Sequence, residues 1–102
     1  MDIAEVTRRV TAAASANPGL GNTLKFDFGA AGKVYIDGLS GQNTVSNDDR
    51  PADCTVMVEW EDFESMTKGV LDPTMAYLMG RMKVQGDLNI ARKLQPFLAK
   101  LR

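Results

Sequence analysis

Groups able to do catalytic chemistry are scarce in this sequence. The 102 residues include no histidine, which removes the usual general base and the commonest transition-metal ligand. Ser15, Ser40, Ser46 and Ser65 therefore lack an activating imidazole, and no Gly-x-Ser-x-Gly motif occurs. Cys54, the one cysteine, lies among apolar residues, which is typical of a small core side chain and not of a reactive thiol. We expect a protein that is not an enzyme.

Acidic residues form two groups that could be mistaken for sites. The segment 47–53 (Asn-Asp-Asp-Arg-Pro-Ala-Asp) lacks the Asp-x-Asp-x-Asp-Gly spacing of a calcium loop and is better interpreted as a solvated turn. Four acids crowd residues 59–64, where two carboxyl groups could share a proton. A solvated helix face is the favoured interpretation, because acids near a helix start also suit its dipole. We expect no metal and no cofactor.

Composition and charge indicate one globular domain, residues 1–102, with 44% hydrophobic and 25% charged residues. A net charge of −1 does not suggest a nucleic-acid partner. No stretch is apolar enough to span a bilayer, and the acidic N-terminus is unlike a secretory signal, so we expect a cytoplasmic protein. Acids dominate residues 53–72 and bases dominate residues 81–102. The basic final helix allows transient contact with an anionic membrane surface, although an ordinary solvated helix face fits as well.

Methionine is the least ordinary feature of the composition. Five of the six methionines, Met57, Met66, Met75, Met79 and Met82, fall within a quarter of the chain. Methionine is flexible and polarizable, so it suits surfaces that accommodate varied apolar shapes. With Phe63, Tyr77 and Leu78, these side chains could line a lipid pocket or simply fill a core.

The first half of the chain predicts a helix followed by three strands. Asp2 followed by Glu5 resembles a capping box, and apolar residues then recur at three- and four-residue steps until Asn17-Pro18-Gly19 ends the helix. Alternation over residues 24–28 and 33–37 predicts a hairpin with one buried face. Residues 42–45 form a weak third strand, and residues 46–53 form a loop.

The second half predicts a strand over residues 54–59 that is apolar on both faces and therefore central in its sheet. A helix over 60–68 follows, with Glu59 as a poor N-cap and Gly69 as its end. Asp72-Pro73 starts a second helix that ends at Gly80, and Met82 and Val84 belong to a fifth strand. Asp87 caps the last helix, which Pro96 interrupts. Strands and helices are partly segregated, so the predicted class is α+β.

Several spaced motifs in this half resemble one family. The matching residues are Ala52-Asp53-Cys54-Thr55, Asp62-Phe63, Gly69, Pro73, Ala76-Tyr77, Gly80-Arg81-Met82-Lys83-Val84, Gly86-Asp87 and Ala91-Arg92-Lys93-Leu94-Gln95. Together they resemble the core signature of the sterol carrier protein type-two domain. The first half of the chain agrees with the same family in the order of its predicted helix and strands. The resemblance implies a five-stranded, mostly antiparallel sheet covered by helices and enclosing an apolar lipid tunnel.

The resemblance also implies that the methionine cluster lines the tunnel. The residues from which we expect the lining to be drawn are Phe63, Met66, Met75, Leu78, Met79, Met82, Val84, Leu88, Ile90, Leu94 and Phe97. Lys83, Arg92 and Lys93 are the candidates for contact with an anionic headgroup or a membrane. The residue before Gly80 is often Gln in the family, and Met79 at this position favours a plain hydrocarbon ligand.

The resemblance implies non-catalytic binding, and intracellular transfer, of a fatty acid, fatty acyl-CoA, sterol or isoprenoid-like lipid. Burial of the hydrocarbon would drive that binding, at about 0.8 kcal/mol for each methylene. The alternative is an accessory subunit that presents a lipophilic intermediate to a partner enzyme, as in quinone biosynthesis. An enzyme in its own right is disfavoured by the missing histidine.

Overall fold

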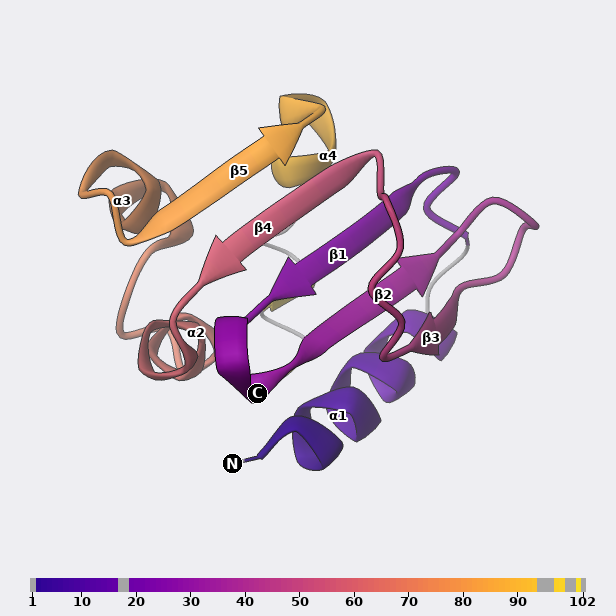
Figure 1. Ribbon diagram of the computed structural model, residues 1–102, viewed down its shortest axis with the longest axis horizontal. Coiled ribbons are helices and arrows are strands. Elements are labelled where there is room, and N and C mark those ends of the chain that lie inside the picture. The colour runs from indigo at the N-terminus through magenta and orange to yellow at the C-terminus, as the bar shows by residue number, and fades with distance from the viewer. Residues whose placement is uncertain (1, 17–18, 94–96, 99–100, 102) are drawn as a thin grey trace.

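A five-stranded sheet organises the chain, as the alternation in the sequence predicts. The computed structural model describes residues 2–16, 19–93, 97–98 and 101. Its strands are β1 (Thr23–Asp27), β2 (Lys33–Asp37), β3 (Thr44–Ser46), β4 (Cys54–Val58) and β5 (Met82–Gly86). Its helices are α1 (Ile3–Ser15), α2 (Trp60–Thr67), α3 (Pro73–Leu78) and α4 (Leu88–Ala91), with a 3-10 turn η1 (Gly29–Ala31) between β1 and β2 (Figure 1).

The strand order is β3-β2-β1-β4-β5. The first three strands form an antiparallel meander, and β4 pairs antiparallel with β5. The two halves join where β1 and β4 run parallel, with Leu24 opposite Cys54 and Phe26 opposite Val56. The predicted α+β class and the mostly antiparallel sheet are therefore confirmed. The strand predicted to be central, β4, is an interior strand between β1 and β5, and the middle strand of the five is β1.

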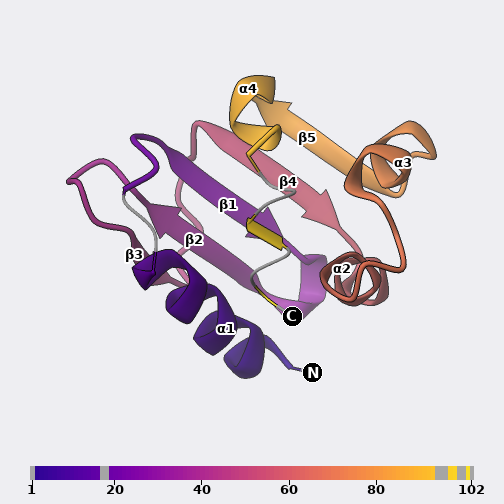
Figure 2. The ribbon, with the colours of Figure 1, turned by 180° about the vertical axis from the view of Figure 1, so that it is seen from behind.

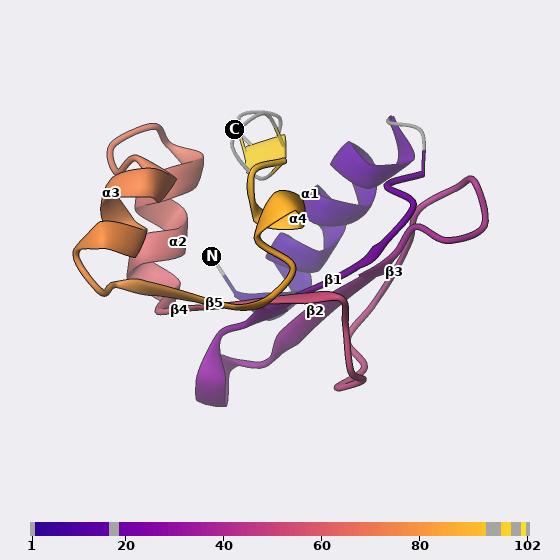
Figure 3. The same cartoon turned by 90° about the horizontal axis from the view of Figure 1, so that it is seen from above.

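The sheet is covered by helices on one face. Figure 3 shows all four helices above the edge-on sheet, and Figure 2 shows them from that side. Alternate strand residues point toward these helices and are buried: Leu24, Phe26, Val34, Ile36, Cys54, Val56, Val58 and Met82. This alternation is the period-two pattern expected of a sheet with one buried face.

The loop between β3 and β4 covers part of the opposite face. Asp49 accepts a hydrogen bond from Lys25 Nζ at 2.9 Å, which lowers the pKa of Asp49 below its usual value of 3.8. Arg50 lies 4.4 Å from the ring centroid of Tyr35. Tyr35 is consequently buried although it faces away from the helices.

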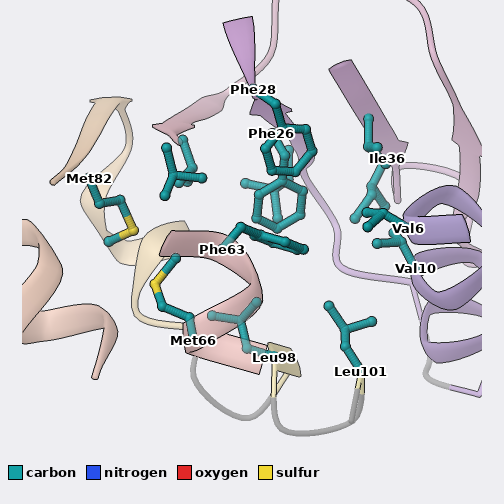
Figure 4. Close-up of a cluster of buried hydrophobic side chains, with 14 of the residues drawn as sticks. Val6, Val10, Phe26, Phe28, Ile36, Phe63, Met66, Met82, Leu98 and Leu101 are labelled. Atoms are coloured by element: carbon teal, nitrogen blue, oxygen red, sulfur yellow. The ribbon is translucent and has the colours of Figure 1, made fainter. Parts of the chain in front are cut away.

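The core fills the space between the sheet and the helices. On α1, Val6, Val10, Ala13 and Ala14 are buried, and Asp2 caps the helix by accepting from the Glu5 amide at 2.9 Å. On α2, Phe63 and Met66 are buried, and Glu59 makes no side-chain cap bond, as its residue type predicts. Figure 4 shows Phe63 and Met66 beside Met82 and the Phe26 and Phe28 rings. The Phe63 ring meets Phe28 edge-on, with centroids 4.9 Å apart.

Several element boundaries differ from the sequence prediction by one or two residues. The third strand spans Thr44–Ser46 and begins two residues later than predicted, because its pairing with Asp37 begins at Thr44. The last helix is described only over Leu88–Ala91. Leu94 and the predicted interruption at Pro96 lie outside the described residues, whereas Leu98 and Leu101 are buried in the core. Within the described part of the chain, every helix is too short or too polar to cross a membrane.

Candidate functional site

An apolar groove lies between α3 and α4, above β5. Its volume is about 270 Å³. Met82 and Val84 of β5 form the floor, and Pro73, Thr74 and Tyr77 of α3 form one wall. Leu88 and Ala91 of α4, with the C-cap residue Arg92, form the other wall. Each wall is a single helix face, because positions 73, 74 and 77, and positions 88, 91 and 92, are spaced by three or four residues.

Helix caps place the two walls. The Asp72 carboxylate accepts a hydrogen bond from the Thr74 amide at 3.0 Å, and Pro73 occupies the first turn of α3, where its missing N–H costs nothing. The Asp87 carboxylate accepts from the Asn89 amide at 2.8 Å. The Asp87 amide itself donates to the Asp53 carbonyl at 2.9 Å, so the start of α4 is tied to the loop that precedes β4.

The groove floor rests on the core. Met82 pairs with Val58 and Val84 pairs with Val56, so the floor is continuous with the buried face of β4. Met82 is 5% exposed, and Val84 is half-buried. The floor is therefore apolar and backed by the core, while Tyr77 and Leu88 on the upper walls are exposed to solvent.

Polar groups on the groove are few. Arg92 is the one charged side chain among the residues that line it, and the other polar groups are the hydroxyls of Thr74 and Tyr77. Within the described residues, no ion pair joins Arg92 to a carboxylate. An apolar floor with one cation at the rim matches an amphiphile whose polar end is anionic.

The predicted lining residues lie in different parts of the structure. Phe63, Met66, Met82 and Ile90 are buried in the core, and Met82 also reaches the groove floor. Val84 and Leu88 line the groove, and Phe97 lies half-buried against the core. Met75, Leu78 and Met79 are exposed and lie outside the groove lining. Leu94 is outside the described residues.

The three predicted cations are also separated. Arg92 lines the groove. Lys93 Nζ lies 3.2 Å from Asn22 Oδ1 and 3.4 Å from the Leu20 carbonyl oxygen, so it binds the segment before β1. Lys83 alternates with Met82 and Val84 and therefore faces the opposite side of the sheet.

The residues that sequence reasoning missed are Pro73, Thr74 and Ala91. They are small or moderately polar, so a search for large apolar side chains does not select them. The signal that could have found them is helical spacing: Pro73 and Thr74 share a face with Tyr77, and Ala91 shares one with Leu88.

A second, more polar depression lies where β1 and β4 end and β5 begins. It measures about 600 Å³, and its lining includes Asp27, Glu59, Asp62, Arg81 and Lys83. Arg81 and Asp62 pair at 3.7 Å, and Lys33 pairs with Asp27 at 3.6 Å. Two of the three lining carboxylates are thus already paired with cations, and a lining with this many charged groups is poorly suited to an apolar chain.

Other chemistry finds little support in the described residues. No group of three or more His, Cys, Asp or Glu side chains is arranged there to hold a metal ion. Cys54 is fully buried in β4, and burial raises the pKa of its thiol, with the charge of Asp87 adding to the effect. A buried, protonated thiol is a poor nucleophile, so its interpretation as a small core residue is confirmed.

Comparisons with known proteins point to one family. The family model for the SCP-2 sterol transfer family matches residues 4–99. Sterol carrier protein 2 of Homo sapiens is 34% identical over 76 residues, which cover 71% of this chain and 14% of that protein. The chain spans less than a fifth of the length of the curated relatives that it matches first.

Several solved structures share the fold, and two of them illustrate the similarity. One is sterol carrier protein 2 of Aedes aegypti in complex with palmitate, with a TM-score of 0.68, 22% identity, and coverage of 97% of this chain and 92% of that one. The other is the ubiquinone synthesis protein UbiJ-SCP2, with a TM-score of 0.70, 17% identity, and coverage of 97% and 94%.

Proposed function

Because the chain belongs to the SCP-2 sterol transfer family, we propose that it binds one lipid molecule non-catalytically and carries it between cellular sites. The lipid would be a fatty acid or a similar single-chain amphiphile. Its hydrocarbon would occupy the groove between α3, β5 and α4, and Arg92 would meet its anionic end. The observation that carries this proposal is the continuous apolar floor of Met82 and Val84 beneath a rim with one cation.

The energetics favour hydrocarbon over polar ligands. A chain segment of roughly ten methylenes gains about 8 kcal/mol on leaving water, from which the cost of immobilising the ligand is subtracted. The groove offers only Thr74, Tyr77 and Arg92 as polar contacts, so a ligand rich in hydroxyl groups would lose hydration without replacing it. The palmitate complex of the Aedes aegypti protein is consistent with this choice of ligand.

Family members differ in the hydrocarbon they take up, and the open upper walls of this groove leave room for bulkier lipids. Acyl-CoAs, sterols and isoprenoid-like lipids therefore belong in the same assay. The tunnel expected from the family resemblance remains part of the proposal, since the described residues outline a groove.

The test is ligand uptake by protein purified without detergent. Native mass spectrometry followed by lipid extraction should find near one lipid per chain. Displacement of a fluorescent fatty acid by palmitate should then be saturable at the same stoichiometry. Absence of saturable uptake of any fatty acid, acyl-CoA or sterol would reject the proposal.

A second candidate is an accessory subunit that holds a lipophilic intermediate for a partner enzyme. The fold shared with a ubiquinone synthesis protein favours it. Purification of the tagged protein from its own cells separates the two functions: a stable, stoichiometric enzyme partner supports the accessory role, whereas a lipid-loaded protein without such a partner supports a free carrier.

A further inference from the structure

One edge of the sheet is formed by β5. In the order β3-β2-β1-β4-β5, this strand pairs with β4 on one side and ends the sheet on the other. All five of its residues follow one unbroken register against β4. An edge strand presents a row of backbone N–H and C=O groups to whatever lies beside it. A second strand can add to such an edge through main-chain hydrogen bonds.

A surface depression shows that this edge is accessible from both faces of the sheet. Its volume is about 550 Å³. On the helix-covered side its lining includes Tyr77, Leu78 and Val84. On the opposite side it includes Met57 and Gln85, which alternate with the inward-facing residues of β4 and β5. A depression lined from both faces of a sheet wraps around the free edge of the outer strand.

The edge at β3 is better protected. This strand has only three residues, and α1 packs against it. The Asn47 side chain, just after β3, donates to the Lys33 carbonyl at 2.9 Å and to Thr7 Oγ1 of α1 at 3.0 Å. Short and covered edge strands are common protection against pairing with another chain. The longer and more open β5 is therefore the edge suited to a partner strand.

The residues of β5 are suited to pairing with an identical strand. Val84 is the middle residue of Met82–Gly86, so antiparallel pairing centred on Val84 aligns both strands over their full length. This register places Lys83 opposite Gln85 of the second copy, and two-fold symmetry repeats the contact. Centring the pair on Lys83 instead sets two lysines directly opposite one another, which is unfavourable. Charge therefore helps to select the register.

Opposite charges meet at both ends of the same pairing. Arg81 precedes the strand and Asp87 follows it, so the register centred on Val84 brings Arg81 opposite Asp87 of the second copy. Arg81 also pairs with Asp62 at 3.7 Å, but its side chain is 53% exposed and a guanidinium carries five N–H donors. Asp87 is exposed, although its Oδ1 accepts from the Asn89 amide. Two symmetric pairs of opposite charge thus favour a second copy as the occupant of this edge.

We propose that two copies of this chain pair through β5 as an antiparallel, two-fold symmetric dimer. The two sheets join into one, and the helices of both copies cover the same face. Figure 1 shows α3 beside the start of β5 and α4 beside its end, so antiparallel pairing sets α3 of each copy next to α4 of the other. Leu78 and Leu88, which are 71% and 53% exposed, lie on these two helices. The dimer does not depend on the proposed lipid ligand.

Sedimentation velocity over a series of protein concentrations tests the dimer. The wild-type chain should dimerise, and Gln85→Lys should weaken the dimer about tenfold, because it sets a lysine opposite Lys83 twice across the two-fold axis. Gln42→Lys is the matched control, since it adds the same charge at an exposed position between β2 and β3. It should dimerise as the wild type does. Lys83→Glu combined with Gln85→Lys should restore the dimer, because opposite charges then face one another.

Disulfide cross-linking tests the register. Only a residue on the two-fold axis faces its own counterpart, at a Cα separation of about 4.5–5.5 Å in an antiparallel pair. That separation is within the range of a disulfide. Val84→Cys should therefore form a covalent dimer under mild oxidation, which non-reducing electrophoresis detects. Thr44→Cys places a thiol on the edge strand β3 and should stay uncross-linked, and the native Cys54 is fully buried.

Three results would overturn the dimer through β5. The first is a chain that stays monomeric from micromolar to near-millimolar concentration. The second is a dimer that Gln85→Lys and Gln42→Lys weaken equally, or in which Val84→Cys forms no disulfide, because another surface then joins the copies. The third is a monomer that holds a different protein at this edge, released by Gln85→Lys. Fatty-acid uptake is measured separately, so a monomer that takes up ligand leaves the proposed function standing.

Discussion

Thr23 and Asp53 exchange two hydrogen bonds although they are thirty residues apart in sequence. The Thr23 amide donates to Asp53 Oδ2 at 2.9 Å, and the Asp53 amide donates to Thr23 Oγ1 at 2.8 Å. The next residues along the chain, Leu24 and Cys54, open the parallel pairing of β1 with β4. The carbonyl of Asp53 also accepts from the Asp87 amide. One residue therefore joins the two halves of the sheet to the start of α4, which forms a wall of the groove.

Breaking this exchange should destabilise the fold. Asp53→Ala leaves the largely buried Thr23 amide without its acceptor, and Thr23→Val leaves the Asp53 amide without one. Each change should lower the free energy of unfolding by about 1–3 kcal/mol. Because the two residues interact directly, the double variant should lose less than the sum of the single losses. Urea unfolding followed by Trp60 fluorescence measures all three, and additive losses would contradict the coupling.

Gly86 should not tolerate a side chain. Its φ of +95° is in the left-handed region, and a Cβ there would come within 2.2 Å of the Asp53 carbonyl oxygen. Gly86→Ala should therefore cost about 3 kcal/mol or more. Gly41→Ala is the matched control, since Gly41 has a φ of +83° and open space around it, so it should cost only about 1 kcal/mol. Thermal unfolding compares the stability of the two variants. Equal losses of stability would show that the Asp53 carbonyl can move aside to accommodate the new side chain.

Cys54 should be protected from thiol reagents in the folded protein. Its side chain is fully buried in β4, and burial raises the pKa of the thiol above its ordinary value of 9.0. An aromatic disulfide reagent should therefore react with it only as fast as the chain opens. Rapid reaction of the native protein at neutral pH would place Cys54 at an accessible surface.

The same raised pKa sets a pH dependence of stability. The unfolded chain releases the Cys54 proton at a lower pH than the folded protein does. The thiol therefore leaves the free energy of unfolding unchanged below pH 9.0 and lowers it as the pH rises above that value. Cys54→Ala should remove this part of the alkaline loss, although the cavity costs stability at every pH. If the free energy of unfolding of the variant and of the wild type fell equally above pH 9.0, the Cys54 thiol would not be the cause of the alkaline loss.

Filling the groove should block ligand uptake without unfolding the protein. Ala91 lines the groove and is only half-buried, so the indole of Ala91→Trp has room to lie in the space proposed for the lipid. Uptake of fatty acid should fall at least about tenfold, because the displaced hydrocarbon stays in water. Ala30→Trp places the same side chain on the exposed turn η1, below the sheet in Figure 3. This control should bind ligand as the wild type does, and equal uptake by both variants would move the site elsewhere.

The charge at the groove rim should distinguish ligands by their polar end. Arg92→Gln should weaken palmitate binding by up to about fivefold, the range of a solvent-exposed ion pair, and leave the binding of methyl palmitate unchanged. Lys93→Gln removes the neighbouring cation, which binds Asn22 and the Leu20 carbonyl instead, and should affect neither ligand. Calorimetric titration measures the affinity for both ligands. An equal loss of affinity for palmitate and for methyl palmitate would exclude a headgroup role for Arg92.

Local patterns in the sequence determined the elements and their faces. Alternation along β1, β2 and β5 and the cap residues Asp2, Asp72 and Asp87 act over a few residues, so they can be interpreted without knowing the fold. The position of Lys83 on the opposite face from Met82 follows from that alternation alone. The missing histidine likewise limits the chemistry, because a side chain that is absent from the chain is absent from every arrangement of it.

The tertiary structure decided which apolar residues form core, groove or surface. Met82 and Met75 are the same residue type in neighbouring elements, yet one is 5% exposed and the other 48%. Met82 lies on the helix-covered face of the sheet, near Phe63 and Met66 (Figure 4), whereas Ala76 occupies the inward face of α3 and leaves Met75 outside. Periodicity assigns each side chain to a face of its own element. Burial of that face depends on which distant segment packs against it, and here that was set by the parallel pairing of β1 with β4 and by the contact between Thr23 and Asp53.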